Sequence, residues 1–178
     1  MTKKDLKRKL TTIFSADVAE YGRLMCRDED TTVITLSAYR EIMSESIRRH
    51  RGRVVDAVGD NLLAEFGCAV DAVACAVTVQ KKLHAENLDL PGDKWMRFRI
   101  GINYGEVIEE GKRLYGTGVN ITARLESKAD PGGICISRPV LGRIQRLLPL
   151  QFEYMGQYSV KNICKKVEVY RIIPAQTE

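Results

Sequence analysis

Residues 51–67 read RGRVVDAVGDNLLAEFG, and this stretch predicts how the rest of the chain is organised. Two short apolar runs, Val54–Val58 and Leu62–Phe66, lie on either side of the tripeptide Gly59-Asp60-Asn61. A Gly-Asp pair between β-forming residues is typical of a tight hairpin. Asp60 is therefore expected at the turn, with Asp56 four residues earlier on the same hairpin. An aspartate in a turn is usually a turn former, so Asp60 alone does not indicate a site.

A second aspartate ends the first predicted strand. Residues 10–17 are rich in β-forming residues and end at Asp17, which no strand-pairing pattern requires. Taken together, Asp17 and Asp60 resemble the metal-binding pair of the class III nucleotide cyclases, which carry one aspartate at the end of the first strand and one in a Gly-Asp hairpin. The resemblance extends from about Thr11 to Arg171. It implies that Asp17, the backbone carbonyl of Val18 and Asp60 hold two Mg²⁺ or Mn²⁺ ions.

Three further segments carry the resemblance. Residues 99–107 read RIGINYGEV, and residues 114–126 read LYGTGVNITARLE, a Gly-rich loop that enters a helix. Asn120 and Arg124 are four residues apart and so share one helix face. In the cyclases, such an asparagine orients the ribose and such an arginine stabilises the phosphate in the transition state. Lys161 matches the lysine that contacts the triphosphate.

The resemblance also implies an α+β fold, with a ferredoxin-like βαββαβ core followed by extra C-terminal strands and a helix. We expect a basic lead-in at residues 1–9, the catalytic domain at 10–173 and a tail at 174–178. Helices are predicted at 28–50, 69–87 and 138–147, and strands at 94–103, 104–108, 134–137, 152–159 and 167–172. The inward face of the first long helix is predicted to carry Val33, Leu36, Tyr39, Met43 and Ile47.

Composition excludes several classes of function. At 178 residues the chain is one domain, and its net charge of +5 comes without the pattern of a nucleic-acid module. No apolar run is long enough to span a membrane. The five cysteines show no metal-ligand spacing, so we expect reduced thiols in a cytoplasmic protein. The two histidines are far apart in the sequence, which gives neither a zinc site nor a nucleophile triad.

In the family, the active site forms between two catalytic domains, and this chain holds the residues of both. The resemblance therefore implies a head-to-tail homodimer that closes a nucleoside triphosphate into its 3′,5′-cyclic monophosphate and releases pyrophosphate. Two departures favour an alternative, a catalytically silent nucleotide-binding module of the same fold. Glu20 and Asn162 stand where family members often have glycine.

The residues expected to read the base also depart from the family pattern. Adenylyl cyclases usually have lysine at the position of Asp56 and aspartate or threonine at the position of Arg113. An acceptor at Asp56 and a donor at Arg113 suit an N–H beside a C=O, as in guanine or uracil. We therefore expect GTP or UTP rather than ATP or CTP. Small bacterial cyclases that make cyclic pyrimidine nucleotides in phage defence have a similar layout. The alternative is an Asp56–Arg113 salt bridge that reads nothing, with loose selectivity that includes ATP.

Overall fold

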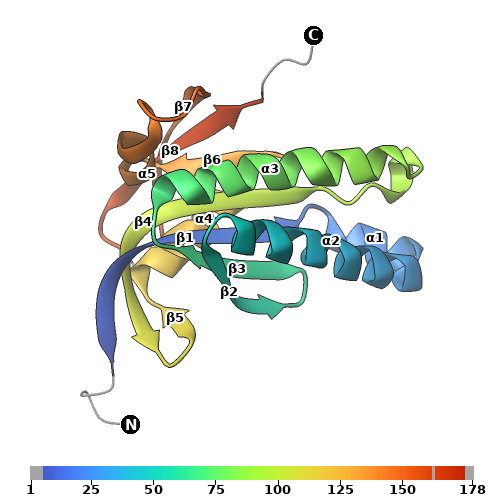
Figure 1. The fold of residues 1–178 in the computed structure, drawn as a ribbon, viewed down its shortest axis with the longest axis horizontal. Helices are drawn as coiled ribbons and strands as arrows, with labels where there is room; N and C mark the ends of the chain where they lie inside the picture. The colour runs from blue at the N-terminus through green and yellow to red at the C-terminus, as the bar shows by residue number, and fades with distance from the viewer. Residues whose placement is uncertain (1–5, 162, 175–178) are drawn as a thin grey trace.

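The computed structural model describes residues 6–161 and 163–174, and these form one mixed sheet with helices on both faces (Figure 1). In chain order the elements are β1 (Lys7–Val18), α1 (Tyr21–Arg27), α2 (Glu29–Arg49), β2 (Gly52–Val58), β3 (Asn61–Phe66), α3 (Ala69–Leu88), the 3₁₀ turn η2 (Gly92–Lys94), β4 (Phe98–Glu110), β5 (Arg113–Tyr115), α4 (Thr117–Lys128), β6 (Ile134–Ser137), α5 (Arg138–Ile144), β7 (Gln151–Ser159) and β8 (Lys166–Ile173).

The sheet has the strand order β2-β3-β1-β4-β6-β8-β7, with β5 paired to β4. Its first four strands, joined by helical crossovers after β1 and β3, are the predicted ferredoxin-like βαββαβ core. Strands β6, β8 and β7 extend the sheet beyond β4, and α5 packs against them, as expected for the C-terminal part. The fold class predicted from the sequence is confirmed.

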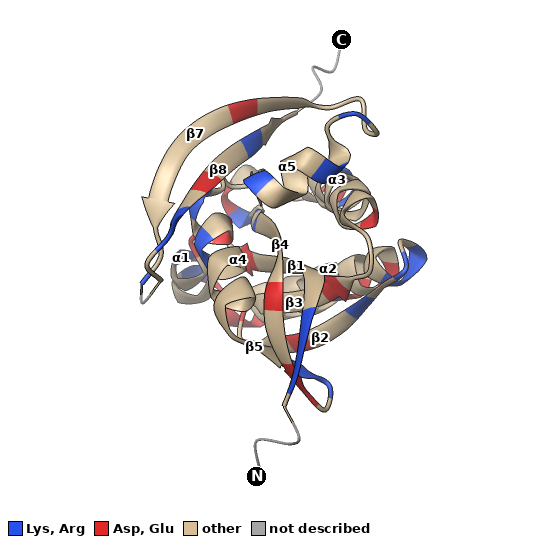
Figure 2. Cartoon of the chain, turned by 90° about the vertical axis from the view of Figure 1, so that its left-hand side faces the viewer, with Lys and Arg blue, Asp and Glu red and all other residues tan. Residues whose placement is uncertain are grey.

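Alternation along β1 divides its side chains between the two faces of the sheet. Phe14, Ala16 and Val18 belong to the main core under α2 and α3. Ile13 belongs to a separate cluster near the start of α4, and Ser15 bonds to a side chain of α4. Figure 2, turned by 90° from Figure 1, shows α4 on the opposite side of the sheet from α2 and α3. Asp17, two residues after Ser15, therefore faces the α4 side.

Helix α4 lies unusually close to β4, because glycines stand at both points of contact. A Cβ atom added at Gly101 would lie 2.3 Å from the backbone nitrogen of Glu126. One added at Gly118 would lie 2.5 Å from the carbonyl oxygen of Glu106. Only glycine permits such an approach, so these two positions fix how deeply α4 sits on the sheet.

Several predicted elements differ in extent. Strand β4 begins at Phe98 rather than at residue 94, because Asn87 binds the backbone of Met96 and holds this segment to the end of α3. It then runs unbroken to Glu110, paired with β1 from Phe98 to Glu109, instead of forming the two predicted strands. Strand β1 likewise begins at Lys7, inside the predicted lead-in. The predicted helix at 138–147 ends at Ile144.

The predicted inward face of α2 is correct at four of its five positions. Leu36, Tyr39, Met43 and Ile47 are buried, but Val33 is 47% exposed. Thr32 takes its place, with its hydroxyl donating to the carbonyl of Leu24 at 3.0 Å.

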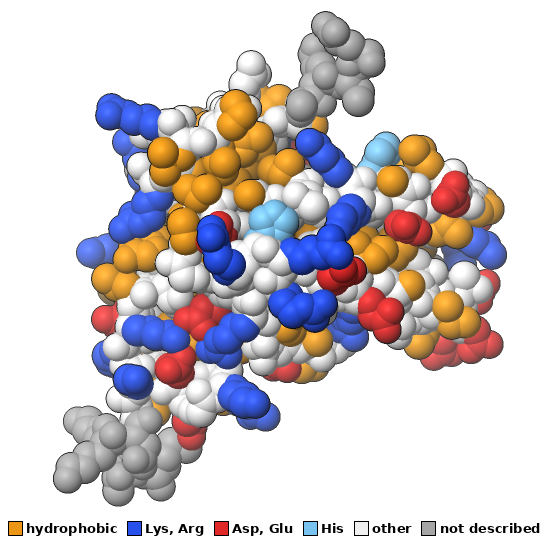
Figure 3. Space-filling view, viewed as in Figure 1, with side chains coloured by type: hydrophobic (Ala, Val, Ile, Leu, Met, Phe, Trp, Pro, Cys, Tyr) orange, Lys and Arg blue, Asp and Glu red, His pale blue; other side chains and the backbone are white. Residues whose placement is uncertain are grey.

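On the outer surface, Figure 3 shows acidic side chains gathered where α2 begins and α3 ends. Acidic residues in the first turn of α2 and basic ones in its last suit the helix dipole.

All five cysteines are free thiols, as predicted, and Cys75 and Cys135 are buried. Within the described ranges, no helix combines the length and the apolar character needed to cross a membrane.

Candidate active site

Asp17 lies at the end of β1 and is held by an arginine from the neighbouring strand. The register of β1 and β4 places Asp17 directly opposite Arg99. The guanidinium donates to both carboxylate oxygens, from Nε to Oδ1 at 2.9 Å and from Nη2 to Oδ2 at 2.5 Å. This bidentate contact raises the pKa of Arg99, and the charges of Asp17, Glu126 and Asp60 add to the effect. The guanidinium of Arg99 therefore binds the Asp17 carboxylate, with Asp60 and Glu126 nearby.

Asp60 reaches the same place from the hairpin between β2 and β3. Val58 pairs with Asn61, which leaves Gly59 and Asp60 as a two-residue loop, as the sequence predicts. Gly59 has φ of 58°, a conformation that glycine adopts without a Cβ penalty. The Asp60 carboxylate accepts a hydrogen bond from the backbone N–H of Val18 at 3.1 Å. The two predicted metal aspartates thus meet at the end of β1.

Glu126 lies on the inner face of α4 and is only 6% exposed. Its carboxylate accepts from the hydroxyl of Ser15 and from the Asn61 amide, the latter at 3.1 Å. Burial raises the pKa of Glu126 to about 8, and the nearby charge of Asp17 acts in the same direction. The buried Glu126 side chain therefore carries a proton at neutral pH and lies next to Asp17.

Asn120, Arg124 and Lys161 lie together in a second place. Asn120 and Arg124 are exposed on the outer face of α4, and both line a hollow of about 590 Å³ that also includes Lys161. Lys161 follows the end of β7 and lies 37 residues after Arg124 in the sequence. The other lining residues are Ala123, Ser127, Ser159 and Val160. Asn162, the second departure from the family pattern, lies outside the described residues.

The two groups lie on different sides of α4. Glu126, beside Asp17, is buried on the inner face of the helix, whereas Arg124 is exposed on the outer face. One chain therefore does not bring its own Arg124 to its own Asp17 and Asp60.

The expected base-reading pair lies at the edge formed by β2 and β5, which contact each other. Tyr115 and the charge of Asp56 raise the pKa of Arg113. Asp56 accepts a hydrogen bond from the backbone N–H of Ala57 at 2.9 Å. Among the described residues, Asp56 and Arg113 form no direct ion pair, so the two side chains do not neutralise each other as a salt bridge.

Glu20 lies in the loop that follows Val18. Its backbone is left-handed, with φ of 55° and ψ of 36°, at the N-cap of α1. This is the conformation that glycine adopts without a Cβ penalty, so a glycine would fit this position. The exposed Glu20 side chain pairs with Arg23 at 3.4 Å, so it turns along α1.

The donor set at Asp17 and Asp60 fits a divalent cation. Carboxylate and carbonyl oxygens are the ligands that Mg²⁺ and Mn²⁺ prefer. Over the described ranges, no three His, Cys, Asp or Glu side chains converge tightly enough to hold a metal by themselves. Mg²⁺ commonly completes such a shell with phosphate oxygens and water. Two carboxylates at an open strand end match that requirement.

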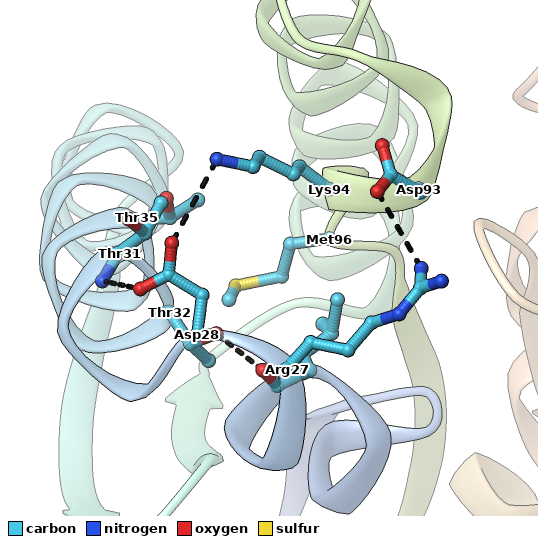
Figure 4. Close-up of a pocket in the computed structure, with 9 residues that line it drawn as sticks. Arg27, Asp28, Thr31, Thr32, Thr35, Asp93, Lys94 and Met96 are labelled. Carbon is cyan, nitrogen blue, oxygen red and sulfur yellow. Dashed lines mark hydrogen bonds and ion pairs between the residues drawn. The ribbon is translucent and has the colours of Figure 1, made fainter.

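A smaller hollow of about 260 Å³ lies away from these residues, between α1, α2 and η2 (Figure 4). Its rim carries two ion pairs, Arg27–Asp93 at 3.5 Å and Lys94–Asp28 at 3.7 Å. Because the acids and bases around this hollow already face each other, it offers no unbalanced charge for a nucleotide. We place the candidate active site at the end of β1 and on the outer face of α4 instead.

Comparison with known proteins identifies the family of this domain. A model of the adenylate and guanylate cyclase catalytic domain matches residues 4–174. The chain belongs to this cyclase family. A protein of Rhizobium meliloti (strain 1021), named as a candidate adenylate cyclase 3, is 38% identical over 98% of this chain. This chain spans 30% of the length of that relative.

Solved structures of cyclases superpose closely on the domain. An adenylate/guanylate cyclase/hydrolase from Silicibacter pomeroyi gives a TM-score of 0.89 at 34% identity, covering 96% of this chain and 99% of that one. The guanylyl cyclase Cya2 gives a TM-score of 0.79 at 27% identity, covering 93% and 92%.

Sequence reasoning missed the residues that support the cyclase aspartates. Arg99 and Glu126 both lie inside motifs that the sequence singles out, but nothing in a motif shows which side chain turns toward Asp17. The alternation of β4 places Arg99 on the same face as Gly101, the face that α4 covers, but its pairing with Asp17 depends on the register of β1 against β4.

Proposed function

We propose that this domain is a nucleotide cyclase whose active site is shared between two copies of the chain. The observation that carries the proposal is the convergence of Asp17 and Asp60 at the end of β1, where the N–H of Val18, the residue after Asp17, donates to the Asp60 carboxylate at 3.1 Å. Asn120, Arg124 and Lys161 line a separate hollow across α4. A head-to-tail dimer would bring one group of each copy against the other group of its partner, giving two equivalent sites.

In the proposed reaction, the ribose 3′-oxygen attacks the α-phosphorus, the bond from that phosphorus to the bridging oxygen breaks, and pyrophosphate leaves. Two Mg²⁺ or Mn²⁺ ions, when bound, would favour loss of the 3′-hydroxyl proton and neutralise phosphate charge. Asp17, Asp60 and the Val18 carbonyl would hold them. The fixed guanidinium of Arg124 would stabilise the negative charge that builds on the α-phosphate oxygens.

The remaining residues bind and orient. Lys161 would neutralise the triphosphate as a point charge, which suits a lysine better than a bidentate contact. Asn120, on the same helix face as Arg124, would hold the ribose in line for the attack. No covalent nucleophile is needed, because the substrate supplies its own.

For the base we propose guanine or uracil. Asp56 can accept from a ring N–H, and Arg113 can donate to the adjacent carbonyl oxygen. The absence of an ion pair between these two described side chains leaves both available to a base. Buried hydrogen bonds of the wrong polarity can reject a substrate by roughly 10⁴-fold. The five free thiols suit the cytoplasm, where we place the protein. A role in signalling or antiviral defence would fit either product.

The test is competition among ATP, GTP, CTP and UTP in Mn²⁺, with each cyclic product separated and identified by mass. We expect cyclic GMP or cyclic UMP to dominate, and Asp60→Ala to abolish it while leaving the thermal unfolding midpoint close to wild type. A clear preference for ATP would refute the polarity argument.

A silent regulatory module is the second candidate, and Glu20 is the observation that favours it. Its carboxylate lies in the loop where family members bind the triphosphate through backbone amides. Release of pyrophosphate from any of the four nucleotides in Mn²⁺ would exclude the silent module. Tight nucleotide binding with no release would support it.

A further inference from the structure

We propose that Arg40 of α2 is a positioning residue for Asp60, acting through the backbone of the hairpin turn. The inference rests on the proposed role of Asp60 as a metal ligand. Arg40 lies in the middle of α2, and Figure 2 shows this helix on the opposite face of the sheet from α4.

The contacts of Arg40 converge on the turn. Its Nη2 atom donates to the carbonyl oxygen of Gly59 and to that of Asn61, the latter at 3.2 Å. These are the residues on either side of Asp60. One guanidinium nitrogen therefore spans the turn and fixes the two residues that bracket the aspartate.

Apart from the turn, no contact in the described structure accounts for the charge of Arg40. Among the described residues it forms no ion pair, and its Nε atom is buried without a partner. A buried donor without a partner is costly, so the side chain is held here by what its Nη2 atom does. The planar fork of arginine is suited to gripping neighbouring acceptors.

The opposite side of the turn is held by other elements. The Asp60 carboxylate accepts from the Val18 amide, and the side chain of Asn61 donates to Ser15 and to Glu126. Asp60 is thus fixed between β1 and α4 on one side and α2 on the other. With Arg40 removed, the turn keeps only its β1 and α4 contacts and can move away from Val18, which separates the two aspartates.

The experiment compares Arg40→Met and Arg40→Lys with Arg48→Met, a change at an exposed arginine of the same helix. Two measurements are made on each full-length protein without nucleotide. The first is the affinity for Mn²⁺ alone, from the electron paramagnetic resonance signal of free Mn²⁺. The second is the hydrogen-exchange rate of the Val18 amide in metal-free protein, which reports the Asp60 contact directly.

We expect R40M to weaken Mn²⁺ binding about ten-fold, equivalent to about 1.4 kcal/mol, and to speed Val18 exchange by a similar factor. R40K keeps a donor and the charge, so it should show a smaller loss of about three-fold. R48M should match wild type. If R40M does not fold, the same comparison between R40K and wild type decides the matter.

Unchanged Val18 exchange in a folded Arg40 variant would overturn the proposal. The Asp60→Ala protein distinguishes a failure of the metal role of Asp60 from a failure of the positioning role of Arg40. If D60A binds Mn²⁺ as well as wild type while R40M still speeds Val18 exchange, the metal role of Asp60 fails and the positioning role of Arg40 stands. If D60A loses Mn²⁺ and R40M does not, the positioning role fails alone.

Discussion

Replacement of Glu126 by glutamine should change how stability depends on pH. Glu126 is buried beneath the active site, and burial together with the Asp17 charge raises its pKa from 4.5 to about 8. Glutamine has nearly the same shape and keeps an oxygen to accept from Ser15 and Asn61. Its amide N–H₂ can stand in for the proton that Glu126 carries toward Asp17. The variant therefore removes the ionisation and keeps the contacts.

The sign follows from the raised pKa. Below pH 4.5 the carboxyl is protonated in both the folded and the unfolded chain, so it contributes no pH dependence. Between pH 4.5 and about 8 the unfolded chain releases the proton and the folded chain keeps it, so wild-type stability falls as pH rises. Each pH unit is worth about 1.4 kcal/mol, which gives an upper limit of about 5 kcal/mol over this window.

The assay is urea unfolding in EDTA, from pH 4.5 to pH 9, of wild type and E126Q. The free energy of unfolding of E126Q should rise relative to that of wild type from pH 4.5 to about pH 8, and the difference should then level off. The matched control is Glu65→Gln. Burial alone would raise the pKa of Glu65, but Lys9, Thr11 and Arg53 more than offset it and lower the pKa overall. Wild type should therefore exceed E65Q by a constant amount above pH 6, and the gap should close as the pH falls below the ordinary range of a glutamate.

A difference between wild type and E126Q that stays the same from pH 4.5 to pH 9 would refute the reasoning. It would mean that Glu126 is ionised in the folded protein at neutral pH, and that an additional negative charge lies next to Asp17.

Three further outcomes are expected. The double change Asp56→Lys with Arg113→Asp should shift the preference toward ATP by at least about ten-fold in kcat/KM, and an unchanged order of the four nucleotides would count against the base-reading pair. Glu20→Gly should raise the free energy of unfolding by up to about 1 kcal/mol, because a left-handed backbone favours glycine. The same change should lower KM for the nucleotide by removing a carboxylate near the phosphates. A loss of stability would show that the left-handed backbone does not strain Glu20. Removing divalent ions with EDTA should abolish formation of the cyclic product, and adding Mn²⁺ should restore it. Product formed in EDTA would contradict the metal role.

Local signals predicted much of the fold. The hairpin around Asp60 is specified by its own turn residues and flanking alternation, so the sequence predicts it to within two residues at every end. Asp17 at the end of the first strand and the helix face that carries Asn120 and Arg124 are equally local. The placement of α4 depends on glycines at 101 and 118, whose need appears only when helix and strand meet.

Features that depend on pairing across long sequence separations could not be predicted. The contact of Asp17 with Arg99 follows from the register of β1 against β4, which alternation within either strand does not specify. The predicted start of β4 at residue 94 is too early, because Trp95 and Met96 continue an apparent strand pattern. Asn87 and Leu90 instead hold these residues at the end of α3, through bonds to the Met96 backbone and the Trp95 indole N–H.

The central claim is that acidic side chains of one copy work with cationic side chains of another. Chains carrying Asp17→Ala and chains carrying Arg124→Ala should each be inactive alone. When they are mixed in equal amounts, about one quarter of wild-type cyclase activity should return, because half of the dimers are mixed and each has one intact site of two. Subunit exchange confirmed by native mass spectrometry, with no recovery of activity, would contradict the shared site.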